Sequence, residues 1–556
     1  MDSTVVLTGM LPAVMLASAG LTAVVSTFLL WLYRKAVLRS MRASTGLTEI
    51  GRPATEAAAG TAGNARPLVI TTIDVKRLPD KSLAAAAAFR VAAQSLRRAT
   101  SIYVVGGLLY ALVFALAWMV VSKAGFIPVR FLWLYTSYSW PVVLTVGLLI
   151  AIDRRQWITL VGVYLAALML IAAVALARNP DLSAGQLAFF WVYANGPATV
   201  LLLTFLNRRV RAVGPLVLVF MVAGVTGAMI AIQVAGSNEG LLRGVVALGS
   251  ALGLGATALY VLLHLFGFMV FGILGWFLLR WIGRRYQLKR FSDQSLSMDA
   301  MWLLFGILQS ITLVFEGWIW IFCGILAFAV YKLVVCNGFA RWARQSGGDG
   351  ELHSLLLLRV FSLRKRSERL FNMMSKLWLR VGSVSLIAGP DLVTTTVEPH
   401  EFLAFLGNRL SRQFVQGNGD LQSRLSRIDR QPDPDGRHRV NEFFCYADTW
   451  QSTMTQLAAQ SNAVLMDLRS FSASNQGCLY ELQQLLGCVP LVRILLVIDK
   501  TTDQGFLEKT LRRLWENIEA TSPNLRVSSP EIRLCEVTSQ SATEIRNLLI
   551  LLLGAQ

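Results

Sequence analysis

The sequence predicts a polytopic α-helical membrane domain of about nine spans, followed by an α/β domain with a mainly parallel, doubly wound sheet. Two observations predict this architecture. First, the 556 residues are 54% hydrophobic and only 15% charged, whereas a soluble domain has about 25% charged residues. Second, apolar runs before residue 340 are long enough to cross a hydrocarbon core, whereas later ones are short and alternate with amphipathic segments. We expect a membrane domain at 1–340, a linker at 341–352 and the α/β domain at 353–556.

The net charge of +19 is distributed as in a membrane protein, because many basic residues come just after apolar runs. Examples are Arg34 and Lys35, Arg154 and Arg155, Arg208 and Arg209, and Arg284 and Arg285. This placement is typical of residues that set topology and contact anionic lipid, so it favours a bilayer over nucleic acid as the partner. It places the N-terminus outside, and both the 34–100 loop and the C-terminal domain in the cytoplasm, at the inner (plasma) membrane of a bacterium.

The spans of the membrane domain follow from its apolar runs. Two longer runs come last: we interpret 241–282 as one long or tilted helix, and 298–335 as a hairpin broken near Glu316 and Gly317. The alternative splits the first run, keeps the second whole and places the basic segment GRRYQLKR outside. In the 34–100 loop we expect a flexible middle at 51–67 and a helix at the membrane surface at 81–98. The runs of ordinary length are 5–33, 102–122, 131–152, 157–177, 187–206 and 213–235.

His264 and Glu316 are the ionisable candidates at membrane depth, where such groups are functional hypotheses by default. The alternative is structural: Glu316 caps the hairpin turn, and His264 bonds a neighbouring helix. A transporter would show polar residues recurring on several spans or broken helices in matching halves, and the sequence has no clear internal repeat.

The α/β domain is predicted from strands and helices in alternation, which favours a parallel sheet covered on both faces. We expect a mostly polar, exposed loop at 415–439. The predicted strands are 354–361, 383–388, 440–446, 463–468, 493–498 and 531–537. The predicted helices are 367–380, 399–414, 449–460, 478–487, 502–518 and 541–553.

The six cysteines show no CxxC spacing, so neither a metal site nor a redox motif is indicated. The last four, Cys445, Cys478, Cys488 and Cys535, are expected to be buried free thiols in a reducing compartment.

Polar residues follow most of the predicted strands. In an open α/β sheet, ligands bind in the crevice beyond the carboxyl ends of the strands, so these residues form a candidate pocket. The alternative is that each acid is only a helix cap or turn residue. P-loop, GxGxxG, GxSxG and HExxH motifs are absent from the sequence. The candidates are Arg359, Ser362, Asp391, Asp448, Asp467, Arg469 and Asp499.

One segment of this domain, residues 457–499, resembles a TIR domain. AAQSNAVLMDL is similar to the family's helix end and strand, and GCLYEL is similar to the start of the helix that follows its Ser-containing loop. The resemblance implies a flavodoxin-like sheet, self-association, NAD as a possible substrate with no required cofactor, and Glu481 as the catalytic acid. Gly477 stands where the family usually has Trp, the first strand lacks the family's usual opening, and 392–439 looks like added material.

A carboxylate at position 481 would stabilise positive charge on the ribose as nicotinamide leaves. The alternative is an early-turn acid favoured by the helix dipole. We therefore expect a membrane-anchored signalling or defence protein that binds or hydrolyses NAD or a related nucleotide. The other hypotheses are a non-enzymatic nucleotide-sensing scaffold and a transporter with a regulatory domain.

Overall fold

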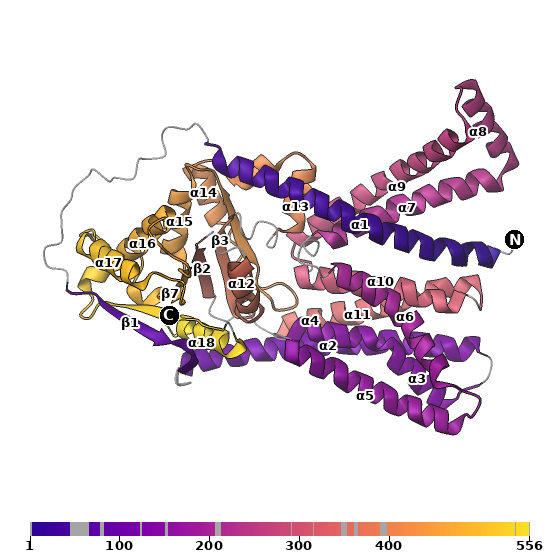
Figure 1. Ribbon diagram of the computed structural model, residues 1–556, viewed down its shortest axis with the longest axis horizontal. Helices are drawn as coiled ribbons and strands as arrows, with labels where there is room; N and C mark the ends of the chain where they lie inside the picture. The colour runs from indigo at the N-terminus through magenta and orange to yellow at the C-terminus, as the bar shows by residue number, and fades with distance from the viewer. Residues whose placement is uncertain are drawn as a thin grey trace. The chain divides into compact units, whose positions relative to one another are not determined.

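The chain forms two compact units, which are described separately below (Figure 1). The helical unit comprises Met1–Leu32, Ala99–Ser346 and Val397–Leu403, and the α/β unit comprises Tyr33–Arg98, Gly347–Thr396 and Ala404–Gln556. The computed structural model describes residues 3–44, 66–77, 83–122, 125–150, 154–205, 213–290, 292–314, 316–345, 353–360, 365–389, 397–539 and 541–554.

Long apolar helices make up the helical unit, and α1 and α2 also contribute residues to the α/β unit. In the described chain, nine helices are long and apolar enough to cross a membrane, which agrees with the predicted number. The helices are α1 (Ser3–Arg42), α2 (Leu83–Val121), α3 (Pro128–Tyr138), α4 (Trp140–Ile150), α5 (Arg154–Arg178), α6 (Ala184–Phe205), α7 (Gly214–Ser237), α8 (Glu239–Ala251), α9 (Ala256–Gln287), α10 (Asp293–Val314) and α11 (Phe322–Gln345).

The two longest apolar runs break differently from each other. The prediction of one helix over 241–282 is wrong, because α8 ends at Ala251 and α9 begins at Ala256, with Gly253 at a φ of +68° that favours glycine. The predicted hairpin near Glu316 is confirmed: Gly317 has a φ of +149° between α10 and the short 3₁₀ turn Trp318–Ile321 that leads into α11. Hydropathy alone shows neither break.

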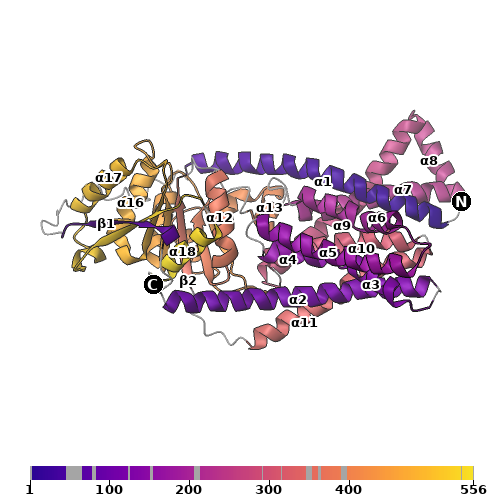
Figure 2. The ribbon, with the colours of Figure 1, turned by 60° about the horizontal axis from the view of Figure 1, so that its bottom comes forward.

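The segment between α1 and α2 differs from the expected loop. Residues Val69–Asp74 form β1, which pairs in parallel with β8 (Glu531–Glu536) at one edge of the sheet. Figures 1 and 2 show purple β1 beside the yellow C-terminal strands. The predicted surface helix at 81–98 is helical, but it is the first part of the continuous helix α2 rather than a separate element. The predicted flexible middle lies mostly outside the described residues, which resume at 66.

The α/β unit contains an eight-stranded parallel sheet in the order β1-β8-β7-β6-β2-β3-β5-β4. Every one of the six predicted strands is present, and the structure adds the edge strands β1 and β4. The remaining strands are β2 (His353–Arg359), β3 (Gly382–Ile387), β4 (Phe414–Val415), β5 (Val440–Cys445), β6 (Ala463–Asp467) and β7 (Ile494–Ile498).

Helices cover both faces of this sheet, as the alternation predicted. Leu356 and Leu358 of β2 belong to a core that contains residues of α15, α16 and α17, whereas Leu355 and Leu357 belong to a core with α12 and α18. The predicted helix 399–414 ends early, at Leu406, and the predicted loop 415–439 contains the helix α14. The helices of this unit are α12 (Lys365–Trp378), α14 (Asn418–Leu425), α15 (Trp450–Gln460), α16 (Gln476–Cys488), α17 (Gln504–Glu516) and α18 (Ala542–Leu553), whereas most of α13 (Pro399–Leu406) belongs to the helical unit.

The order of the strands locates the switch point of the doubly wound sheet. If β1 and the two-residue β4 are left aside, the order β5-β3-β2-β6-β7-β8 corresponds to 3-2-1-4-5-6. A flavodoxin-like sheet has the order 2-1-3-4-5, so that part of the prediction is wrong. The cause is the connection after β5, which returns the chain to the centre, so that β6 lies beside β2. The crevice expected to bind ligands is therefore at the carboxyl ends of β2 and β6.

Candidate functional site

Two of the predicted residues meet at the switch point itself. Arg359 and Asp467 are paired residues at the last register position of β2 and β6. Both are buried, which is unusual for charged residues unless they have partners. The Arg359 guanidinium donates to the Ile387 carbonyl of β3, with an Nη1–O distance of 3.4 Å.

Asp467 is held by Arg469 in a bidentate ion pair. Arg469 Nε donates to Oδ1 at 2.7 Å and Nη2 donates to Oδ2 at 2.6 Å, and both side chains are only 1% exposed. Arg469 Nη2 also donates to the Arg366 carbonyl at 3.2 Å. Because both carboxylate oxygens of Asp467 are engaged, this pair fixes the loop after β6 and leaves ligand contacts to its neighbours.

Glu481 is the acid at this site that has a free oxygen. It is the sixth residue of α16, so it lies beyond the first turn, and the helix-dipole explanation for it does not apply. Its side chain is buried, and no residue of the described chain hydrogen-bonds its Oε2. Burial raises the pKa of Glu481 to about 8, although the Arg359 guanidinium acts in the opposite direction. At neutral pH this carboxyl therefore keeps its proton.

Cys478 lies three positions before Glu481, on the same helix. Burial raises the pKa of its thiol well above the usual range, and the nearby Glu481 and Asp467 raise it further. The thiol therefore stays protonated and is not a reactive nucleophile. The prediction of free thiols is confirmed for all four cysteines of the α/β unit, but Cys488 is exposed rather than buried.

Asp499, at the end of β7, lies in a second polar cluster. Its carboxylate forms an ion pair with Arg366 and accepts hydrogen bonds from the backbone N–H and the hydroxyl of Thr501 at 2.9 and 2.6 Å. Arg366 Nη1 also lies 3.3 Å from the hydroxyls of Ser470 and Thr501. Sequence reasoning missed Arg366, because it begins an amphipathic helix and no pattern links it to strands more than a hundred residues away.

The remaining predicted residues do not join this site in the described chain. Asp448 follows β5, two strands from β2, where its Oδ2 accepts a hydrogen bond from Ser44 at 2.7 Å. Ser362 and Asp391 lie outside the described residues. The site at the switch point thus consists of Arg359, Asp467, Arg469 and Glu481.

In the helical unit, His264 and Glu316 have local roles. His264 Nδ1 lies 2.9 Å from the Tyr260 carbonyl of its own helix, so the expected bond to a neighbouring helix is not the one observed. Glu316 is exposed in the hairpin turn. The sequence reasoning missed the ion pair between Asp299 of α10 and Lys332 of α11. A useful signal would have been opposite charges on the two arms of one apolar hairpin.

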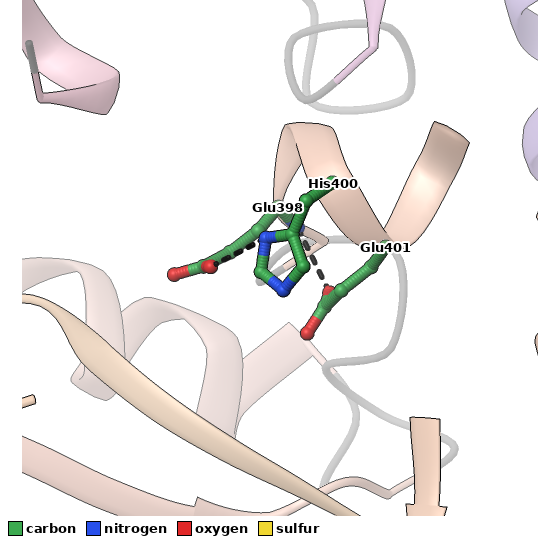
Figure 3. A group of neighbouring side chains, drawn as sticks. All are labelled: Glu398, His400 and Glu401. Carbon is green, nitrogen blue, oxygen red and sulfur yellow. Dashed lines mark hydrogen bonds and ion pairs between the residues drawn. The ribbon is translucent and has the colours of Figure 1, made fainter. Parts of the chain in front are cut away.

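A third group, Glu398, His400 and Glu401, has its ligand atoms within 4.8 Å of one another (Figure 3). Glu401 Oε2 accepts a hydrogen bond from the Glu398 N–H at 2.9 Å, and His400 Nδ1 lies 3.2 Å from Glu398 Oε2. These are the contacts of a helix N-terminus, here that of α13, and they account for the grouping without a metal ion.

Comparisons with known proteins identify no relative of this chain. A scan against protein-family models, a search of curated proteins and a search of solved structures each gave no match.

Proposed function

We propose that this chain is a multi-pass protein of the bacterial inner membrane whose cytosolic α/β domain binds a nucleotide beyond the carboxyl ends of β2 and β6. The observation that carries the proposal is the buried Glu481 carboxyl, whose Oε2 has no hydrogen-bond partner in the described chain. Buried polar groups are almost always hydrogen-bonded, so an orphan at a switch point is the expected mark of a ligand contact.

The chemistry of the site fits a nucleotide. A protonated Glu481 can donate one hydrogen bond and accept another, as recognition of a base or a ribose requires. Arg359, beside it, supplies the positive charge that suits a phosphate. Arg366, at the start of α12, and the hydroxyls of Ser470 and Thr501, in the loops after β6 and β7, would take a second phosphate. These side chains would replace the glycine-rich loop that the sequence lacks.

The proton on Glu481 favours binding without turnover over NAD cleavage. Stabilisation of a cationic ribose requires a carboxylate, whereas burial keeps this group neutral at pH 7. NAD hydrolysis is the second candidate, supported by the TIR resemblance and by the free oxygen of Glu481. It requires that the bound substrate ionise Glu481. Self-association of the domain and contact of the basic loops with anionic lipid belong to the same proposal.

Substitutions at Glu481 separate the two candidates. We expect Glu481→Ala to weaken binding by about 10–100-fold, because the base or ribose atom that Glu481 hydrogen-bonds would be left buried without a partner. Glu481→Gln retains a donor and an acceptor, so it should keep most of the affinity while abolishing any NAD cleavage. The measurements are calorimetric titration of the purified full-length protein with NAD⁺ and ATP, and nicotinamide release in lipid.

The matched control is Glu516→Ala, which removes an exposed acid at the end of α17. If neither NAD⁺ nor ATP binds the wild-type protein, the nucleotide proposal fails. If wild type releases no nicotinamide, the hydrolase candidate fails and binding stands alone; if Glu481→Gln releases it as fast as wild type, Glu481 is not the catalytic acid.

The cytosolic placement of the α/β unit is tested with its exposed thiol. Cys488 is exposed, whereas Cys445, Cys478 and Cys535 are buried. In a Cys336→Ser background, we expect an impermeant maleimide to leave intact spheroplasts unlabelled and to label Cys488 after permeabilisation. Further replacement of Cys488 by Ser should abolish the signal. Equal labelling of intact and permeabilised spheroplasts would place the unit outside.

A further inference from the structure

The α10–α11 hairpin of the helical unit contains an ion pair at membrane depth. Asp299 lies in the first half of its candidate span, 294–313, and Lys332 lies near the middle of its span, 322–344. The two side chains are 16% and 33% exposed and are joined through Lys332 Nζ and Asp299 Oδ2. Ionisable residues in apolar spans are costly and usually mark an ion pathway, a proton relay or a ligand site.

Asp299 lies among buried polar atoms that the described protein leaves without hydrogen bonds. These atoms are Asp299 Oδ1, the Tyr331 hydroxyl and Trp302 Nε1, and both rings are fully buried. The rings of Trp302 and Tyr331 stack at a centroid distance of 4.8 Å, and Asp299 lies one helical turn before Trp302. Buried polar atoms without protein partners inside a helix bundle require water or a solute to complete their hydrogen bonds.

A nearby network shows how fully satisfied polar residues differ from this group. The Tyr110 hydroxyl donates to Gln309 Oε1 at 2.7 Å, and Gln309 Nε2 donates to Asn195 Oδ1 at 2.9 Å. Asn195 Nδ2 in turn donates to the Ser137 carbonyl at 3.1 Å. This network links α2, α10, α6 and α3, and hydrogen bonds of this kind stabilise the packing of helices in a membrane bundle. Through the contact between the Tyr110 and Trp302 rings, it adjoins the Asp299 group.

We propose that the helical unit conducts protons and that Asp299 is its proton-binding group, with Lys332 as the internal counter-charge. The free Oδ1 accepts a proton from water on one side, which converts the carboxylate to a carboxylic acid. Lys332 remains an ammonium, so the charge of the site changes from zero to +1. Release of the same proton to the other side restores the ion pair.

Protonation of Asp299 leaves the Lys332 ammonium without a counter-charge, and this favours release of the proton. An ammonium without its counter-charge is strongly unfavourable in an apolar interior, so the protonated site is driven to open to water. The titratable groups beside Tyr331, apart from Asp299 itself, are Tyr103 of α2 and Cys336 of α11. Lys332 is the charged side chain that pairs with Asp299, so it decides the charge balance at this site.

The test is proton entry into vesicles that contain the purified full-length protein and an internal pH dye. We expect an imposed pH gradient to drive protons into wild-type vesicles faster than into protein-free ones. Asp299→Asn alone would leave Lys332 unpaired and risks misfolding. The decisive variant is therefore Asp299→Asn with Lys332→Gln, which removes both charges and keeps the size of both side chains.

This double variant should keep the thermal stability of the fold and lose proton entry. The control is Glu316→Gln, which neutralises the exposed acid in the turn of the same hairpin and should conduct as wild type. Wild-type entry no faster than in protein-free vesicles overturns the proposal. So does equal entry through the double variant, because the ion pair would then be only structural.

Discussion

Replacing Arg469 by Ala is expected to lower the free energy of unfolding of the α/β unit by about 3–5 kcal/mol. The substitution leaves the Asp467 carboxylate buried at the centre of the sheet without the guanidinium that contacts both of its oxygens. It also removes the hydrogen bond to the Arg366 carbonyl at the start of α12. The loss is large because a carboxylate that is 1% exposed cannot recover the interaction from water.

Hydrogen–deuterium exchange in the full-length protein is the suitable measurement, since it isolates β6 and β7 from the helical unit. The expected destabilisation corresponds to about 10²–10⁴-fold faster exchange in these strands, at tenfold for each 1.4 kcal/mol. Arg513→Ala, an exposed change on α17, is the control and should alter exchange little. Exchange in the Arg469 variant within threefold of wild type would contradict a stabilising role for the ion pair.

The second large effect is a dependence of stability on pH that comes from Glu481. Its pKa is about 8 in the folded chain, above the ordinary value of 4.5. Between these values the folded state binds more protons than the unfolded state, so the free energy of unfolding falls as pH rises. The stabilisation is complete below pH 4.5 and is lost as pH rises through 8. Over the full interval its size is about 5 kcal/mol.

Glu481→Gln removes this titration without changing the size of the side chain. The variant should therefore gain stability relative to wild type as pH rises from 5 to 8, as measured by urea unfolding of the two proteins at each pH. Glu516→Gln, at an exposed position, should show no such divergence from wild type. A constant difference between wild type and Glu481→Gln across this range would show that the carboxyl is already ionised at pH 5.

The buried strands could be predicted because strands covered on both faces appear as continuous apolar runs, such as Ile494–Ile498. Edge strand β1 was missed because its residues, VITTID, are partly exposed and its partner is remote in sequence. The same limit applies to the site. Arg359 and Asp467 were found because they lie at the ends of predicted strands, and Glu481 was found through the TIR resemblance of its helix. Arg366 was missed because it contacts Asp499 from a helix 133 positions away.

Charges inside the spans were harder to find, for a physical reason. Hydropathy averages over a window, so a single Lys332 inside an apolar run does not change the prediction of a span. Its pairing with Asp299 depends on the register of α10 against α11, which the turn at Gly317 sets. The break between α8 and α9 was missed similarly, because Gly253 adds little to an average but changes the backbone direction.

The position of β1 has a consequence for biosynthesis. Arg66, just before β1, donates to the Ser528 carbonyl just before β8, and these residues are 462 positions apart. A ribosome therefore completes β1 long before the strand that pairs with it, and this edge of the sheet cannot close until β8 has been translated. Until then β8, with Ile532 and Leu534, has not been synthesised. During that time β1 must avoid pairing with other nascent chains. Translation of β8 thus decides whether β1 completes this sheet or pairs with a strand of a neighbouring chain.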